Sequence, residues 1–136
     1  MVIMSVDYGD SRTGLAVCDR SEFLASPAGV IFEKYETKVI EAVSQKSKEL
    51  KAELIVVGHP RNMDGSYGER AEKCRAFADL LKEKTGIEVA LWDERLTTVS
   101  AHKVLNEVNV RGQKRKNVVD AVAAVMILED FMKSRK

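Results

Sequence analysis

Short apolar runs separated by polar turns open the chain. Residues 2–6 are almost all apolar and lead into Asp7, and a second apolar run at residues 15–18 follows a polar turn that carries glycine. This pattern predicts two antiparallel strands joined by a hairpin. A third strand is expected within residues 23–32, where Pro27 indicates an edge or a bend.

The hydrophobic period then changes from that of strands to that of helices. Val39, Ile40, Val43 and Leu50 recur at helical spacing, and the apolar run at residues 54–58 is typical of a parallel strand buried on both faces. The remaining pattern predicts, in order, a helix from about Gly68 to Gly86, a strand over 87–92, a short helix from Thr97 or Thr98 to about Glu107, a basic loop, and a final helix capped by Asn117 and ending near Met132.

This order of elements predicts an α/β fold. Its mixed five-stranded sheet has three antiparallel strands followed by two parallel strands, with helices on both faces. The 136 residues have the size of one domain, 1–136. A composition of 45% hydrophobic and 32% charged residues excludes a disordered chain.

No apolar run reaches the ~18 residues of a membrane span, and the first residues lack the layout of a signal peptide. We therefore expect a cytoplasmic protein with no membrane partner. Cys18 and Cys74 are far apart in the sequence and have no neighbouring metal-ligand residues, so buried free thiols are expected.

The formal net charge of +1 carries no information about partners, but the basic residues are unevenly distributed. The densest cluster consists of Arg111, Lys114, Arg115 and Lys116. Such a cluster is usually a solvated surface, and it is also the smallest footprint for phosphate contact. Taken alone, the solvated surface is the favoured interpretation.

Carboxylates stand at three places where apolar elements begin or end. Asp120 interrupts the apolar stretch 118–128, Asp7 ends the first strand, and Asp93 and Glu94 follow the last strand. A helix dipole could stabilise Asp120 and an Asx turn could hold Asp7, so each residue has a structural interpretation. If the carboxylates converge on one edge of the sheet, they suit Mg²⁺ or Mn²⁺, the ions that drive phosphodiester hydrolysis.

The loop after the fourth strand leads into a helix N-terminus, which is a ready anion site. Arg61 within this loop and Arg70 at the start of the helix are candidates for phosphate contacts. A well-capped turn is the structural alternative. His59 at the start of the loop is interpreted as a packed or hydrogen-bonded residue rather than a catalyst.

Four motifs in one order resemble the YqgF family, whose members are also called RuvX-like Holliday junction resolvases. The motifs are Asp7-Tyr8-Gly9 with Arg12 and Gly14, Gly58-x-Pro60 with residues 62–66, Asp93-Glu94-Arg95 with residues 96–98, and Lys116 before Val119-Asp120. The resemblance runs from Ile3 to Leu128. It implies a ribonuclease H-like fold in which Asp7, Glu94 and Asp120 hold the divalent metals. Asp93 is the alternative to Glu94, although it would face the other side of an ideal strand.

The resemblance implies a hydrolase, a divalent-metal-dependent nuclease that acts on structured nucleic acid. Its expected substrate is the 5′ end of the 16S ribosomal RNA precursor in ribosome biogenesis. The residues expected to contact nucleic acid are all basic: Arg12, Arg61, Arg70, Arg95, Arg111, Lys114, Arg115 and Lys116.

Three alternatives stay open from the sequence. A Holliday junction resolvase in DNA recombination and repair would need a homodimer for two coordinated cuts, so monomer and homodimer are both retained. An actin-like nucleotide-binding protein would share the sheet but would need a second domain to enclose ATP. A non-catalytic nucleic-acid-binding module is disfavoured because all three carboxylates are present.

Overall fold

A computed structural model describes residues 1–22, 24–59, 68–93 and 112–135, with side chains in the last range described from Val122 onward. Its elements, in chain order, are β1 (Ile3–Asp7), β2 (Arg12–Cys18), β3 (Ala25–Phe32), α1 (Glu36–Leu50), β4 (Leu54–His59), α2 (Glu69–Thr85), β5 (Glu88–Asp93) and α4 (Gly112–Ser134). None of the helices in the described ranges is long and apolar enough to cross a bilayer.

One five-stranded sheet organises the chain, in the order β3-β2-β1-β4-β5. β1 pairs with β2, and β2 with β3, in antiparallel fashion, whereas β4 and β5 add in parallel beyond β1. The predicted combination of three antiparallel strands and two parallel strands is confirmed. Pro27 lies in the edge strand β3, beside a register shift between Leu15 and Ala16 on β2, which agrees with the interpretation of an edge.

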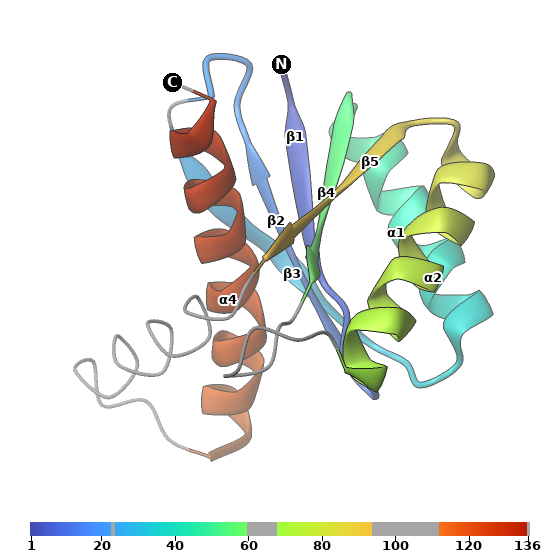
Figure 1. Ribbon diagram of the computed structural model, residues 1–136. Coiled ribbons are helices and arrows are strands. Elements are labelled where there is room, and N and C mark those ends of the chain that lie inside the picture. Colours follow the sequence, from blue (N-terminus) through green and yellow to red (C-terminus); the bar gives the residue numbers. More distant parts are fainter. Residues whose placement is uncertain (23, 60–67, 94–111, 136) are drawn as a thin grey trace.

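The helices cover the two faces of this sheet separately. Helices α1 and α2 lie on one face and α4 crosses the other (Figure 1). Successive strand residues therefore alternate between two cores. Phe77 of α2 belongs to the first core with Met4 and Val6, and Ile127 of α4 belongs to the second with Ile3. Cys18 and Cys74 are free, buried and in different cores, so the expectation of buried thiols is confirmed.

Helix α4 corrects one part of the prediction. It begins at Gly112 and not after Asn117, so Lys114, Arg115 and Lys116 belong to its first turns rather than to a loop. Lysine, arginine and glutamine are good helix formers, and Asn117 marks a start only where the preceding residues do not propagate the helix. The short helix expected between Thr97 and Glu107 lies outside the described residues.

The ends of the other two helices follow local rules. Gly86 takes the left-handed conformation (φ 71°) predicted for the C-cap of α2. Lys51 does the same after α1 (φ 57°), so α1 ends at Leu50, the last residue of its apolar helical pattern. Both helices start at the end of the sheet where β1 ends (Figure 1).

Candidate active site

Strand β1 presents different chemistry to the two faces of the sheet. Met4 and Val6 point into the core under α1 and α2, whereas Ile3 points into the core under α4. Because side chains alternate along a strand, Ser5 and Asp7 share the α4 face with Ile3. Asp7 is half-buried at the carboxyl end of this central strand.

A buried hydrogen bond fixes how α4 lies against β1. The Ser5 hydroxyl, fully buried, donates to the carbonyl oxygen of Ala124 at 2.6 Å. Ala124, Leu128 and Met132 are buried at four-residue intervals on α4, so they form its sheet-facing stripe. Sequence reasoning missed Ser5, although a serine inside an apolar strand and two residues before Asp7 is the signal that could have revealed it.

The direction of α4 extends this alignment toward Asp7. The N-terminus of β1 and the C-terminus of α4 lie at the same end of the sheet, so the two elements run in opposite directions (Figure 1). From Ser5 to Asp7 the strand advances about 6.6 Å. From Ala124 back to Asp120 the helix moves about 6 Å the same way. Position 120 therefore lies one turn before Ala124, at the level of Asp7.

The turn after Asp7 is held by Arg70 at the start of α2. The Arg70 guanidinium donates to the Asp10 carboxylate at 2.6 Å and to the backbone carbonyl of Tyr8. Gly9 is required in this turn, because a Cβ atom there would lie 2.1 Å from the carbonyl oxygen of Arg12. Arg70 was predicted to contact phosphate, and the structure gives it these two partners inside the protein.

Tyr8 anchors the same turn from the other face. Its ring stacks on Phe77 with centroids 4.1 Å apart, and its hydroxyl donates to Glu36 at 3.4 Å. Burial first, and then the Glu36 carboxylate, raise the pKa of Tyr8 above its ordinary value. The phenol is therefore neutral at physiological pH, and its two contacts hold the residue that follows Asp7.

At the end of β5, Trp92 and Asp93 belong to opposite faces of the sheet. Trp92 packs against the core under α4, where its ring meets Phe131 edge-on at 5.6 Å. Asp93, the next residue, therefore belongs to the opposite face, where it is paired in register with His59 of β4. His59 is 6% exposed, which agrees with its interpretation as a packed residue.

The predicted site residues divide into described and undescribed positions. Asp7, Arg12, Arg70 and Asp93 are described, and Asp120, Lys114, Arg115 and Lys116 are described as backbone of α4. Arg61, Glu94, Arg95 and Arg111 lie outside the described residues. Within the described ranges no three His, Cys, Asp or Glu side chains form a group that could hold a metal ion. The side chains of Glu94 and Asp120 are outside that search, so the ligand set of Asp7, Glu94 and Asp120 stays a prediction.

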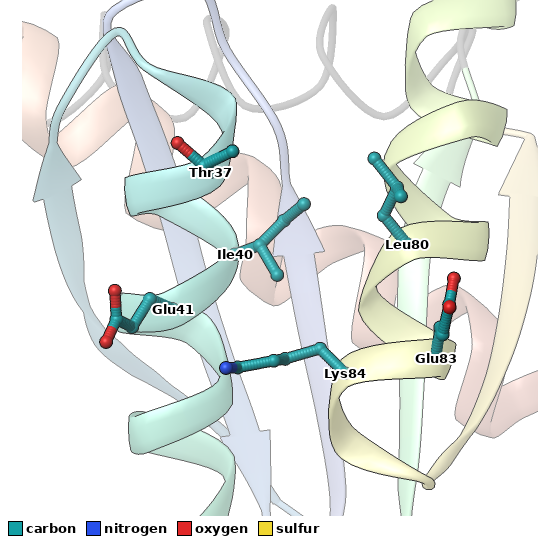
Figure 2. A pocket seen from close by; sticks show the side chains of 6 residues that line it. All are labelled: Thr37, Ile40, Glu41, Leu80, Glu83 and Lys84. Carbon is teal, nitrogen blue, oxygen red and sulfur yellow. The ribbon is translucent and has the colours of Figure 1, made fainter.

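A groove between α1 and α2 contains none of the predicted residues. It has a volume of about 610 Å³ and is lined by Thr37, Ile40, Glu41, Leu80, Glu83 and Lys84. Figure 2 shows Lys84 reaching from α2 toward α1 across this groove. The groove lies on the sheet face opposite to the one that carries Asp7, so it is separate from the candidate site.

Comparison with known proteins identifies the chain's relatives. The family model described as "RuvX: Holliday junction resolvase" matches residues 1–134. A protein of Halothermothrix orenii named "Putative pre-16S rRNA nuclease" is 44% identical over 132 residues, which cover 97% of this chain and 94% of that protein. A protein of Lachnospira eligens with the same name is 42% identical over 139 residues, covering 100% and 99%.

Solved structures agree with the fold. Thermus thermophilus RuvC in complex with a Holliday junction substrate superposes with a TM-score of 0.63 at 15% identity, covering 99% of this chain and 95% of that one. The fowlpox virus Holliday junction resolvase superposes with a TM-score of 0.62 at 12% identity, covering both chains fully. The predicted ribonuclease H-like fold is thereby confirmed, and the match over residues 1–134 shows that the chain belongs to the RuvX (YqgF) family.

Proposed function

We propose that this chain is a divalent-metal-dependent nuclease whose single domain spans residues 1–136. One observation carries the proposal: the buried hydrogen bond from Ser5 to Ala124 aligns α4 with β1. This alignment brings position 120 to the level of Asp7 at the edge where the central strand ends. Two acidic positions from distant parts of the sequence would then lie on one face of the sheet.

Asp7, Glu94 and Asp120 would hold the metal, Mg²⁺ or Mn²⁺. The donors would all be carboxylate oxygens, which is the set that these hard cations prefer. The packing of Trp92 on the α4 face supports Glu94 over Asp93, because a residue that continued the strand after Asp93 would return to the face of Asp7. When bound, such an ion activates a water molecule and stabilises the charge that develops on the leaving oxygen.

The chain's own basic residues would position the phosphates. Arg12 lies on the same sheet face as Asp7, because it precedes Gly14, the cross-strand partner of Asp7, by two residues. Lys114, Arg115 and Lys116 begin the helix that carries Asp120, and Arg61, Arg95 and Arg111 complete the proposed set. Arg70 contributes through the turn that it holds, and a phosphate contact by Arg70 remains part of the proposal.

The precursor of 16S ribosomal RNA is the substrate that we propose, acted on in the cytoplasm. The names of relatives about 40% identical over nearly the whole chain support this choice. A second candidate, cleavage of Holliday junctions, is supported by the description of the family. A resolvase must make two coordinated cuts, so the second candidate requires a homodimer, whereas the first is compatible with a monomer.

A paired cleavage assay tests the proposal. The purified protein is incubated with a 16S ribosomal RNA precursor and with a four-way DNA junction, each with Mg²⁺, with Mn²⁺ and with a chelator. Metal-dependent cleavage of the precursor is expected. Preferential cleavage of the junction, together with a dimer in sedimentation, would select the second candidate. Absence of cleavage of both substrates in either metal would refute the nuclease.

A further inference from the structure

The aromatic side chains of the described residues fall into two groups. Tyr8 and Phe77 stack on each other, and Trp92 meets Phe131 edge-on. Phe32 and Tyr35 are instead 57% and 56% exposed, and they lie three positions apart between β3 and α1. Exposed aromatic rings close to a candidate site are candidates for a binding surface.

This segment is tied to the turn that follows Asp7. Phe32 is the cross-strand partner of Arg12, so both belong to the sheet face of Asp7. The backbone N–H of Glu33 donates to the carbonyl oxygen of Ser11 at 3.1 Å. The β3–α1 connection and the end of β1 lie at the same edge of the sheet (Figure 1). From the strand spacing and the two-residue offset, Phe32 lies about 12 Å from Asp7, counted between Cα atoms.

Two lysines of the segment lie against the exposed ring of Tyr35. The ammonium groups of Lys34 and Lys38 each lie 5.4 Å from the centre of the Tyr35 ring. The acidic neighbours have protein partners, because the Glu33 carboxylate accepts the backbone N–H groups of Lys34 and Tyr35 at 3.2 and 3.3 Å. Glu36 accepts the hydroxyl of Tyr8. Glu33 and Glu36 balance the two lysines, and Arg12, the cross-strand partner of Phe32, adds one positive charge. The segment therefore offers two exposed aromatic rings, with two ammonium groups beside Tyr35 and Arg12 paired with Phe32.

We propose that Arg12, Phe32, Lys34, Tyr35 and Lys38 form a docking surface, the β3–α1 platform, for an unpaired strand of the nucleic acid substrate. The proposal deepens the proposed nuclease function and rests on it. Phe32 and Tyr35 stack on bases, and the basic residues contact the flanking phosphates. Stacking on a ring requires a base that is not already stacked in a duplex. The platform therefore selects substrates with a single-stranded segment beside the scissile bond.

A tryptophan probe placed in the platform tests stacking directly. In a Trp92→Phe background, Phe32→Trp introduces the chain's one tryptophan, whose fluorescence is measured without metal during titration with a single-stranded RNA oligonucleotide. We expect saturable quenching that the same sequence in a duplex does not produce. In the otherwise wild-type chain, Phe32→Ala and Tyr35→Ala should each weaken single-strand binding by about 5- to 150-fold, while Phe32→Tyr should restore most of the affinity.

Leu80→Ala is the matched control, because Leu80 is 42% exposed and lies in the groove between α1 and α2 (Figure 2). It should leave RNA affinity unchanged, and thermal unfolding should confirm that all variants fold. Unchanged affinity in both alanine variants of a protein that still binds and cleaves RNA would overturn the platform alone. A change of oligomeric state in Phe32→Ala, with RNA affinity retained, would also overturn it by assigning the surface to a protein partner. A wild-type chain that neither binds nor cleaves nucleic acid would refute the proposed function itself.

Discussion

The two faces of the sheet use the same strand in opposite ways. On the face of α1 and α2, β1 contributes Met4 and Val6, both fully buried in an apolar core. On the face of α4 it contributes Ile3, Ser5 and Asp7, so the side chains become more polar toward the carboxyl end. The first face contributes stability along its whole length, and the second carries the candidate site where its core ends.

Packing explains why the polar residues are confined to one face. Where α4 passes Ser5 it presents Ala124, which is fully buried, while Ile127 and Leu128 fill the neighbouring space on this face. Small side chains let the helix backbone approach β1 closely enough to accept the Ser5 hydrogen bond at 2.6 Å. On the other face, β1 presents Met4 and Val6 to Phe77 and Leu81, so β1 places no hydroxyl group there. A hydrogen bond from the strand to the helix backbone needs the close packing of the α4 face.

The largest expected effect comes from removing charge at the end of the α4 face. Asp7→Asn and Asp120→Asn keep the side-chain shape but remove the negative charge that would hold a cation. Each should lower metal-dependent cleavage by about 100-fold or more, since the bound ion supplies several kcal/mol of stabilisation to the transition state. Thermal unfolding without metal should stay the same or improve, because a repelling charge is removed. An unfolded Asp120→Asn variant whose folded fraction keeps full activity would make Asp120 a structural residue.

The variants Asp93→Asn and Glu94→Gln test which of these two neighbouring residues acts as the third metal ligand. Asp93 belongs to the face of α1 and α2, so its amide variant should keep cleavage within a few-fold of the wild type. Glu94→Gln should match the loss seen with Asp7→Asn. Cleavage rates over a range of Mg²⁺ concentrations measure both. The reverse ranking would move the third ligand to Asp93 and would contradict the alternation on β5.

The next largest effect is expected in the core under α1 and α2. Phe77 is fully buried and stacks on Tyr8. Phe77→Ala should reduce the free energy of unfolding by about 3–5 kcal/mol, because transfer energy is lost and a cavity remains. Urea denaturation measures this loss. Phe77→Leu should cost less, and an alanine variant with a loss below about 1 kcal/mol would mean that this face contributes little to stability.

Ser5→Ala removes the hydrogen bond that links β1 to α4. Loss of the hydrogen bond to Ala124 should cost about 1 kcal/mol in the free energy of unfolding. It should also weaken Mg²⁺ activation of cleavage, because the alignment of α4 with Asp7 is loosened.

Ser47→Ala is the matched control for this variant, since the buried Ser47 hydroxyl donates to the Ser44 carbonyl at 2.7 Å within α1. It should cost a similar amount of stability and leave Mg²⁺ activation unchanged. Equal changes in Mg²⁺ activation for the two variants would show that Ser5 acts through stability alone.

Most of the fold could be predicted from the sequence because its signals are local. The apolar runs that become β1 and β4, the helical period of Val39, Ile40 and Val43, and Gly86 as a cap all depend on near neighbours. The predicted start of α4 was wrong because it, too, relied on local signals. Asn117 is a good cap locally, but the preceding lysines and arginine also favour a helix, and local preference does not decide between the two.

The site was less predictable because it depends on register between distant segments. Asp7 stands out by its place at a strand end, whereas the role of Ser5 becomes visible only when α4, more than a hundred residues later, lies against it. Arg70 shows the same limit. Its positive charge next to a loop led to the prediction of a phosphate contact. Its partners, Asp10 and Tyr8, are some sixty residues away in the sequence and become visible only in the folded turn.

The smallest expected effect lies at the opposite end of the sheet from Asp7, where charged groups pair with each other. The Glu22 carboxylate accepts a hydrogen bond from the Arg135 guanidinium at 2.8 Å and one from the N-terminal amine at 3.2 Å. These two ion pairs link the start of the chain, just before β1, to the end of α4. The hydrogen bond from Arg135 first, and then the amine, lower the pKa of Glu22 below its ordinary value. A lowered carboxyl pKa contributes stability that is present above the ordinary glutamate pKa and disappears as pH falls through the lowered value. Glu22→Gln should therefore reduce the free energy of unfolding at pH 7 by about 0.2–1 kcal/mol, and the difference from wild type should shrink in acid and in high salt.

Urea denaturation at neutral and acidic pH measures this change, with Glu49→Gln as the control. Glu49 pairs with Lys46 at 3.8 Å on the surface of α1, so its removal should cost less at pH 7. Cleavage activity should be unaffected by both variants, because neither residue lies near the edge that carries Asp7. A stability difference for Glu22→Gln that grows as the pH falls would contradict the lowered pKa. A loss of cleavage would show that the two ends of the sheet are coupled through α4, and the division of the molecule into a structural end and a functional end would then fail.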